Sequence, residues 1–429
     1  MRDRNTEGGP LLAPRPRPRP RRRLRRELRA DFVGALAARI PGGVRDPEFL
    51  ALLESIDEDV FHGDNEVQAF FDGNQAFASM LEAVASAQKE VLLEAYIFKD
   101  DAAGKRFQEE LVGATRRGVT VRVLADAIGS WETRRAFWED MRKGGVEARL
   151  FHPPWNLRFL KFRDHRKILV ADRRVAYTGG MNIGEEYGSS LAPSGGSSGS
   201  GDRVWRDTHA RVEGPAAWEM AVVFEEGWKH AGGKPIGLEP LKPGGSSGAR
   251  VLVLDSRPGR GNKEVSSAFA AIAGGARDRL WITMAYFAPH QRVVRILGEA
   301  AARGVDVRLL VPGKSDVQIV RHAGHGFYSD LLDRGVRVFE YQTAVLHAKT
   351  LVADGYMSAV GSSNLDFRSF ELNAECNFVI AHDQTGRAMD EQYETDLARS
   401  IEVVLPAWRA RPWHHRAGDA LARRLAPML

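Results

Sequence analysis

The sequence predicts an α/β protein built from two similar halves, which pack as a pseudo-twofold pair and share one site. A strand, a helix, an Arg-Gly pair and a second strand occur twice in the same order. This alternation favours crossover connections and a largely parallel sheet in each half. A third block, in which polar residues have the same spacing, then ends each half. Repeats that agree in order and spacing indicate a duplicated unit.

Hydrophobic patterning predicts the strands and helices of each half. Residues 90–99 are apolar between charged ends, as a buried strand is, and a helical pattern over 107–114 separates them from a second strand over 118–126. The second half repeats this arrangement, with strands over 279–289 and 303–312 on either side of a helical pattern. Each half is therefore expected to form its own sheet.

Changes in composition predict the domain boundaries. Residues 232–249 are rich in Gly, Pro and Ser, which is typical of a linker, and a polar stretch over 189–202 is expected to be a mobile surface loop. The expected order is a basic, disordered arm (1–45), a first half (46–231), the linker (232–249), a second half (250–404) and an amphipathic C-terminal tail (405–429).

Composition restricts the class of protein. The 429 residues are 43% hydrophobic and 27% charged, so the chain can bury a sizeable globular core. The one cysteine, Cys376, excludes an intrachain disulfide, and its apolar flanks favour a buried thiol in a reducing compartment. The longest apolar stretch, residues 280–289, has the length of a strand, so neither a membrane-spanning helix nor a secretory signal is expected.

The positive charge of the chain is concentrated in its arm. Residues 15–29 hold nine arginines against one glutamate, and without this segment the net charge of +5 becomes −3. A tract in which proline alternates with arginine is expected to be extended and solvated. It can attract anionic lipid headgroups or nucleic acid phosphates, or it can serve only as a solubilising tail.

The third block carries the motif H-x-K-x-x-x-x-D, followed after seven residues by G-x-x-N. Its members in the first half are His165, Lys167, Asp172, Gly179 and Asn182. Its members in the second half are His347, Lys349, Asp354, Gly361 and Asn364, each 182 residues further along. Two copies with identical spacing indicate a functional site rather than unrelated surface residues on repeated strands.

The spacing of the motif directs two of its side chains to one place. Residues i and i+2 of a strand share a face, so His and Lys project together, whereas the Asp falls near the strand end, where a structural hydrogen-bond acceptor is expected. Two halves packed face to face would bring two His, two Lys and two Asn around one pocket. Lysine and amide donors suit a phosphate, and histidine can attack phosphorus or donate a proton.

No metal and no other cofactor are expected. The lysines supply the positive charge that a phosphate site needs, and H-x-K lacks the paired ligand spacing of zinc sites.

Both motifs resemble the HKD motifs of the phospholipase D superfamily, and the resemblance extends over residues 66–429. It implies two phospholipase D-like halves with one shared active site. The implied catalytic set is His165, His347, Lys167, Lys349, Asp172 and Asp354. By the same resemblance, His165 is the nucleophile that forms a phosphohistidine, and His347 acts as general acid and then as base.

The resemblance implies further site residues. The implied ligands of the substrate phosphate are Asn182, Asn364 and Ser362. Glu375 and Asp207 would be the carboxylates that orient the partner histidines, with Asp207 displaced along the chain by the Gly/Ser-rich stretch. The first half has Gly180 where the second has Ser362, so one hydroxyl ligand is missing.

Within the superfamily, the likeness is greatest to bacterial cardiolipin synthases of the type without transmembrane helices. The stretches that carry it begin at Leu93, Tyr177, Trp205 and Gly361. The implied function is a phosphatidyltransferase that converts two phosphatidylglycerol molecules into cardiolipin and glycerol. The implied partners are this phospholipid substrate and an anionic membrane surface, and the implied location is peripheral, on the cytoplasmic face of a bacterial cell membrane.

The C-terminal tail predicts a basic amphipathic helix. The residues that share its apolar face are Trp413, Ala417, Ala420, Leu421 and Leu425. Such a helix suits a membrane surface, although a terminal helix docked on the body has the same pattern.

Two alternatives remain open at this point. A phospholipase D or a nuclease of the same superfamily would use the same residues, with water as the acceptor. A nuclease, and nucleic acid as a partner, are disfavoured because the chain outside the arm has no excess of positive charge. An inactive membrane-surface scaffold is expected to have lost a motif histidine or lysine, and all four are present.

Overall fold

The computed structural model describes residues 31–57, 59–152, 161–188, 205–238, 245, 247–257 and 263–428. The arginine tract (15–29), the polar stretch (189–202) and the middle of the expected linker lie outside these residues, so their expected properties stay predictions.

The first half alternates strands and helices. Its elements are β1 (His62–Phe70), α4 (Gly73–Ser86), β2 (Glu90–Ala95), α5 (Ala102–Arg116), β3 (Thr120–Asp126), α6 (Arg135–Lys143), β4 (Glu147–Phe151), β5 (Lys167–Ala171), β6 (Val175–Gly179), β7 (His209–Glu213) and α7 (Ala216–His230).

The second half repeats this order, inserts three short elements and adds further elements at its end. It contains β8 (Ala249–Ser256), α8 (Glu264–Gly275), β9 (Arg279–Met284), β10 (Phe287–Ala288), α9 (Gln291–Ala302), β11 (Asp306–Pro312), α10 (Gln318–Leu332), β12 (Arg337–Tyr341), β13 (Lys349–Ala353), β14 (Met357–Gly361), β15 (Leu365–Asp366), α11 (Phe367–Glu371), β16 (Glu375–Ala381), α12 (Asp383–Leu397), β17 (Ser400–Glu402), α13 (Leu405–Arg409), α14 (Trp413–Leu425) and η4 (Ala426–Met428).

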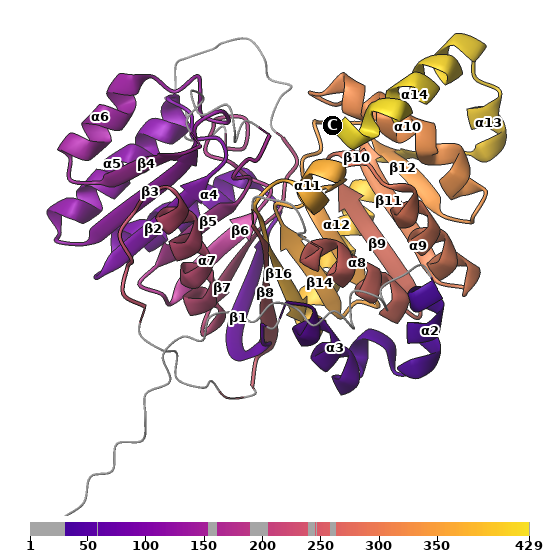
Figure 1. Cartoon of the computed structure of the whole chain (residues 1–429), viewed down its shortest axis with the longest axis horizontal. Coiled ribbons are helices and arrows are strands. Elements are labelled where there is room, and N and C mark those ends of the chain that lie inside the picture. Colours follow the sequence, from indigo (N-terminus) through magenta and orange to yellow (C-terminus); the bar gives the residue numbers. More distant parts are fainter. Residues whose placement is uncertain are drawn as a thin grey trace, which may run out of the picture.

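The strands confirm the duplicated architecture. From the seam outward, the order is β1-β7-β6-β5-β2-β3-β4 in the first half and β8-β16-β14-β13-β9-β11-β12 in the second, where β17 adds an edge strand. Each strand of the first half therefore has a counterpart in the second. At the seam β1 pairs antiparallel with β8, and the two halves lie side by side about it (Figure 1). The expectation of a separate sheet in each half is therefore wrong, because this pairing joins both halves in one 15-stranded sheet.

The expectation of largely parallel sheets is only partly correct. β2, β3 and β4 pair in parallel, as do β9, β11 and β12, because helices connect them. β5, β6 and β7 pair antiparallel, as do β13, β14 and β16. The turns that join β5 to β6 and β13 to β14 are too short for a crossover, and a short turn allows only antiparallel pairing.

Helices cover both faces of the strands, because alternate strand residues point to opposite sides. In the first half, α4, α5 and α6 pack on one face around Phe77, Phe107 and Trp138. In the second half, α8, α9 and α10 take the equivalent position. A third core contains α7, α12 and strand residues of both halves, so it lies between the halves and fixes their relative position.

The N-terminal segment differs from its expected boundaries. Residues 31–57 form α2 (Asp31–Arg39), η1 (Gly43–Arg45) and α3 (Pro47–Asp57), which pack on α8 of the second half rather than belonging to an arm and the first half. Leu36, Phe49 and Leu53 are buried there, and Arg45 forms an ion pair with Asp383 at 2.8 Å. Averaging composition over residues 1–45, where arginine dominates, obscures the apolar periodicity that begins at residue 31.

No helix among the described residues combines the length and apolarity needed to span a bilayer.

Candidate active site

His165 lies immediately before β5 and contacts the second half directly. Its backbone N–H donates to the carbonyl of Ala374 at 2.9 Å, and its ring Nδ1 lies 3.1 and 3.0 Å from the two carboxylate oxygens of Glu375. Glu375, at the start of β16, also accepts hydrogen bonds from the hydroxyls of Ser362 and Ser369 at 2.5 and 2.8 Å. The carboxylate is therefore fully engaged in holding the ring of His165.

His347 repeats this arrangement in the opposite direction. It lies before β13, its backbone N–H donates to the carbonyl of Arg206 at 2.8 Å, and its ring Nδ1 lies 2.7 Å from Asp207 Oδ2. Asp207 belongs to the first half and also accepts from the Thr208 N–H at 2.7 Å. Each histidine is thus oriented by a carboxylate of the other half, and both carboxylates stand where the sequence analysis expects them.

The electrostatics of the His165–Glu375 pair define the tautomer of the histidine. Burial raises the pKa of Glu375, but the His165 ring, the nearby Lys167 and the hydrogen bond from Ser362 together stabilise the carboxylate, and its pKa lies below the usual value. Burial lowers the pKa of His165 to about 4, although Glu375 opposes this shift. At neutral pH His165 is therefore neutral, its Nδ1–H donates to the ionised Glu375, and the lone pair lies on Nε2.

The lysines have a stronger influence on the pKa values of the His347–Asp207 pair. Burial, and then the ammonium groups of Lys349 and Lys167, lower the pKa of His347 well below its usual value. Burial raises the pKa of Asp207 to about 6, while Lys349 opposes the shift.

The two lysines are buried beside the histidines. Burial lowers the pKa of Lys167 to about 7 and that of Lys349 to about 8, and in each case the buried carboxylates oppose the shift. Lys167 Nζ donates to the carbonyl of His165 at 2.7 Å, and Lys349 Nζ lies 3.0 Å from Nε2 of His347. Two ammonium groups held away from water form a strong anion site, because their charge is weakly screened.

The asparagines of the motif are oriented by the strands next to them. Asn182 accepts from the Ile97 N–H at 3.1 Å and donates to the Tyr187 hydroxyl at 2.9 Å. Asn364 accepts from the Tyr286 N–H at 3.3 Å, so its amide nitrogen is left to act as a donor.

Ser362 differs from its expected role as a phosphate ligand. Its hydroxyl donates to Glu375 Oε2 at 2.5 Å and accepts from the Cys376 N–H at 3.0 Å. Because a hydroxyl has one proton, Ser362 in this state holds Glu375 and has no donor left for a phosphate.

The motif aspartates lie at the opposite ends of their strands from the lysines. The Asp172 carboxylate accepts from the backbone N–H groups of residues 88–90 at 2.7 to 3.0 Å. The Asp354 carboxylate accepts in the same way from the backbone N–H groups of residues 277–279, at 2.9 to 3.0 Å. Both aspartates take a left-handed conformation, with φ of 54° and 53°. This geometry corrects their place in the catalytic set: they close hairpin turns instead.

Sequence reasoning missed the aromatic residues around the site. The Tyr96 ring contacts His165 edge-on at 4.9 Å between centroids, and Tyr286 contacts His347 at 5.7 Å. Lys167 and Lys349 lie over these same two rings, at 5.5 and 5.6 Å. An Ala-Tyr pair occurs at the end of both repeated strands, 95–96 and 285–286, and this signal was available in the sequence.

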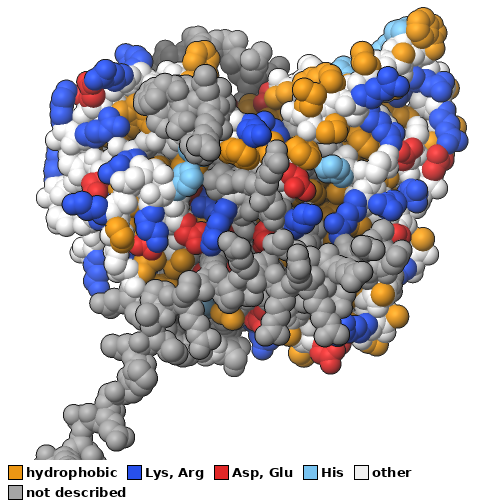
Figure 2. Space-filling model, viewed as in Figure 1, with side chains coloured by type: hydrophobic (Ala, Val, Ile, Leu, Met, Phe, Trp, Pro, Cys, Tyr) orange, Lys and Arg blue, Asp and Glu red, His pale blue; other side chains and the backbone are white. Residues whose placement is uncertain are grey.

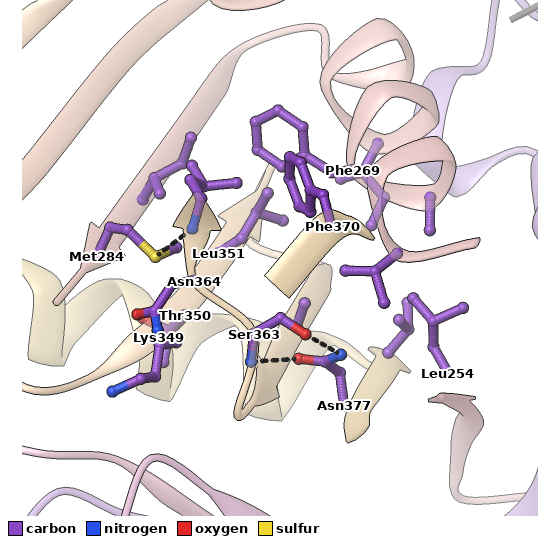
Figure 3. Close-up of a pocket in the computed structure, with 17 residues that line it drawn as sticks. Leu254, Phe269, Met284, Lys349, Thr350, Leu351, Ser363, Asn364, Phe370 and Asn377 are labelled. Carbon is purple, nitrogen blue, oxygen red and sulfur yellow. Dashed lines mark hydrogen bonds between the residues drawn. The ribbon is translucent and has the colours of Figure 1, made fainter. Parts of the chain in front are cut away.

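An apolar cavity of about 60 Å³ adjoins the site on its second-half side. Lys349 lies at one end with its amine turned away from the apolar lining, and Phe269 and Phe370 lie at the other end (Figure 3). Ser363 and Asn377 are joined by hydrogen bonds at its wall. A space of this size holds a few water-sized groups and cannot enclose a long acyl chain.

Comparisons with known proteins agree with this geometry. A family model described as cardiolipin synthase, PLD-like domain, matches residues 80–189 and 270–397, and each segment contains one H-x-K motif. The chain is 33% identical over 365 residues to a cardiolipin synthase of Halalkalibacterium halodurans, across 83% of this chain and 71% of that protein. It is 32% identical over 373 residues to cardiolipin synthase 1 of Bacillus anthracis, with the same coverage.

A solved structure has the same fold. The phosphatidylserine synthase of Haemophilus influenzae superposes with a TM-score of 0.68 over 89% of this chain and 100% of that chain, at 14% identity.

Proposed function

This chain belongs to the cardiolipin synthase family of phospholipase D-like phosphatidyltransferases, and from this premise we propose that it joins two phosphatidylglycerol molecules into cardiolipin and releases glycerol. The observation that carries the proposal is the pair of crossed histidine–carboxylate contacts beside two buried lysines. Such a site can hold one phosphodiester between a nucleophile and an acid, while the ammonium groups offset its charge.

The first step transfers the phosphatidyl group to the enzyme. Nε2 of His165 attacks the phosphorus of the first lipid, a P–N bond forms, and the P–O bond to the glycerol headgroup breaks. His347 donates a proton to the departing glycerol oxygen. Both lysines donate to the carbonyl of their motif histidine, but Lys349 Nζ also lies 3.0 Å from both ring nitrogens of His347. Within the described residues, Lys167 makes no such contact with the ring of His165, which is therefore favoured as the nucleophile.

The proton on His347 depends on the bound substrate. In the empty site the lysines hold the pKa of His347 low. A phosphodiester anion between the lysines offsets their charge and draws the Lys349 amine from the ring, and both changes favour the imidazolium. The acid is therefore expected to form with substrate bound, at the moment when a leaving group needs its proton.

The second step reverses these roles. His347, now neutral, takes a proton from a headgroup hydroxyl of the second phosphatidylglycerol. That oxygen attacks the phosphorus, the P–N bond to His165 breaks, and cardiolipin is released. Water would give phosphatidic acid by the same route, so the choice of product depends on keeping water out of the site.

The proposed partner surface is an anionic membrane, to which the protein binds peripherally on the cytoplasmic face. The relatives named above are bacterial cardiolipin synthases, and both substrates of the proposed reaction are lipids. The arginine tract would add attraction for anionic headgroups at about 1 kcal/mol for each residue near the surface.

The test is to incubate the purified protein with phosphatidylglycerol vesicles and to separate the lipid products. Cardiolipin with equimolar glycerol is the expected result, and it should disappear in His165→Ala and His347→Ala variants that keep the wild-type circular dichroism spectrum. Phosphatidic acid as the main product would identify a hydrolase instead. Unchanged lipid with folded wild-type protein would reject both activities.

A further inference from the structure

We propose that three exposed apolar elements dock the protein on the bilayer: the loop tips at Trp131 and Val317, which flank the mouth of the active site, and the outer face of α14. The inference rests on the proposed function, because a lipid substrate places the bilayer at this mouth.

The two loop tips are counterparts under the pseudo-twofold relation. Trp131 follows β3, which ends at Asp126, and Val317 follows β11, which ends at Pro312, at the same distance along the chain. Trp131 is 75% exposed, and Val317 and Ile319 are 36% and 41% exposed. Large apolar side chains at two equivalent tips form a matched pair, unlike the scattered apolar residues of an ordinary surface.

Each tip is attached to the wall of the active site. Ser130, next to Trp131, donates from its hydroxyl to the carbonyl of Tyr96 at 3.2 Å. Asp316, next to Val317, accepts from the Tyr286 hydroxyl at 2.7 Å. Because Tyr96 and Tyr286 contact the two catalytic imidazoles, both tips flank the mouth of the site.

The C-terminal helix presents its apolar side outward. Its buried positions are Asp419 and Ala422, and Asp419 contacts His322 of α10 at 2.9 Å. Trp413 and Leu421 point to solvent, with exposures of 77% and 63%, and they share a face because eight residues separate them. A surface helix of a soluble protein normally has the reverse orientation. The helix is therefore docked on the body, as one of the two sequence-based alternatives expects, while its apolar face remains exposed.

The charge around these elements favours a lipid bilayer as the occupant. Lys314, Arg416 and Arg424 are exposed near the tip at Val317 and along α14. Hydrophobic side chains gather along the upper right edge of the molecule, where Figure 1 places α14, with Lys and Arg beside them (Figure 2). Tryptophan with flanking basic residues is typical of surfaces that insert into the headgroup region.

The small cavity at the site gives an independent reason for this orientation. The apolar cavity beside Lys349 has a volume of about 60 Å³ and cannot enclose an acyl chain, so it does not serve as a binding site for the tails of a lipid whose phosphate lies at the lysines. If the mouth faces the bilayer, the tails can remain in the membrane.

The experiment measures sedimentation of the full chain with sucrose-loaded phosphatidylglycerol vesicles. We expect Trp131→Ala combined with Leu421→Ala to weaken binding by about tenfold or more, because each substitution removes a large apolar side chain from the headgroup region. The matched control is Val60→Ala, which shortens an exposed valine that precedes β1, at the end of the first half remote from the tips. It should bind as the wild type does.

A second assay separates failure of docking from failure of the proposed function. Turnover of monomeric short-chain phosphatidylglycerol should be the same in the docking variant and the wild type, because neither residue touches the catalytic groups. Wild-type vesicle affinity in the docking variant, or an equal loss in Val60→Ala, would overturn the docking surface. Absence of cardiolipin from monomers with the wild type would instead reject the chemistry.

Discussion

At the scale of single residues, the site depends on carboxylates that reach across the two halves. Glu375 and Asp207 do not face the substrate; they hold Nδ1 of His165 and His347. A carboxylate in this position selects the tautomer with a lone pair on Nε2 and stabilises the imidazolium when it forms. The catalytic power of each histidine therefore depends on a residue of the other half.

Replacing either carboxylate by its amide should lower kcat with little change in fold. In Glu375→Gln and Asp207→Asn the amide can present its NH₂ group to Nδ1 and favour the wrong tautomer, and we expect a loss of about 10²- to 10⁴-fold. Steady-state kinetics on phosphatidylglycerol, with urea denaturation as the control for stability, would measure this effect. Full activity in either variant would show that the cross-half contact has no part in catalysis.

The buried lysines predict a pH dependence of substrate binding. The pKa values of Lys167 and Lys349 are lowered to about 7 and about 8, so both amines lose their protons in the alkaline range of an activity profile. Only the charged form attracts the phosphodiester, so binding takes up protons and weakens as the pH rises. Above pH 8, KM should increase by about tenfold per pH unit for each lysine that has lost its proton. A KM that is constant from pH 6 to 9 would contradict this account.

At the scale of elements, the HKD aspartates stabilise hairpins. Each carboxylate binds three backbone N–H groups of the loop before a central strand, and each residue takes a left-handed φ that asparagine tolerates better than alanine. Asp172→Ala and Asp354→Ala should therefore lower the free energy of unfolding by about 2 kcal/mol. The Asn variants should lose less. Urea denaturation measures the stability of all four.

Activity per folded molecule separates this role from catalysis. It should stay within a few-fold of the wild type in both Ala variants, because neither carboxylate reaches the phosphate. A loss of several hundredfold in a variant of unchanged stability would return the aspartates to the catalytic set.

At the scale of the whole molecule, the sequence predicts what is repeated and misses what forms only by long-range contact. The identical spacing of the motifs that contain His165 and His347 indicates a shared site, because strand periodicity places the His and the Lys of each motif on one face. The antiparallel hairpins follow from short local turns, but the pairing of β1 with β8 and the packing of residues 31–57 on α8 depend on segments far apart in the chain. Local patterns do not encode such pairings, so they required the structure.

The central claim is that two distant histidines act on one phosphorus, with His165 as the nucleophile. The most direct measurement is to trap the covalent intermediate in His347→Ala with phosphatidyl-p-nitrophenol, whose leaving group needs no proton. Without its base, the second step should be slow, and mass spectrometry after an alkaline quench should find the phosphatidyl adduct on the peptide that contains His165. An adduct on another residue, or release of p-nitrophenol without any adduct, would contradict the account.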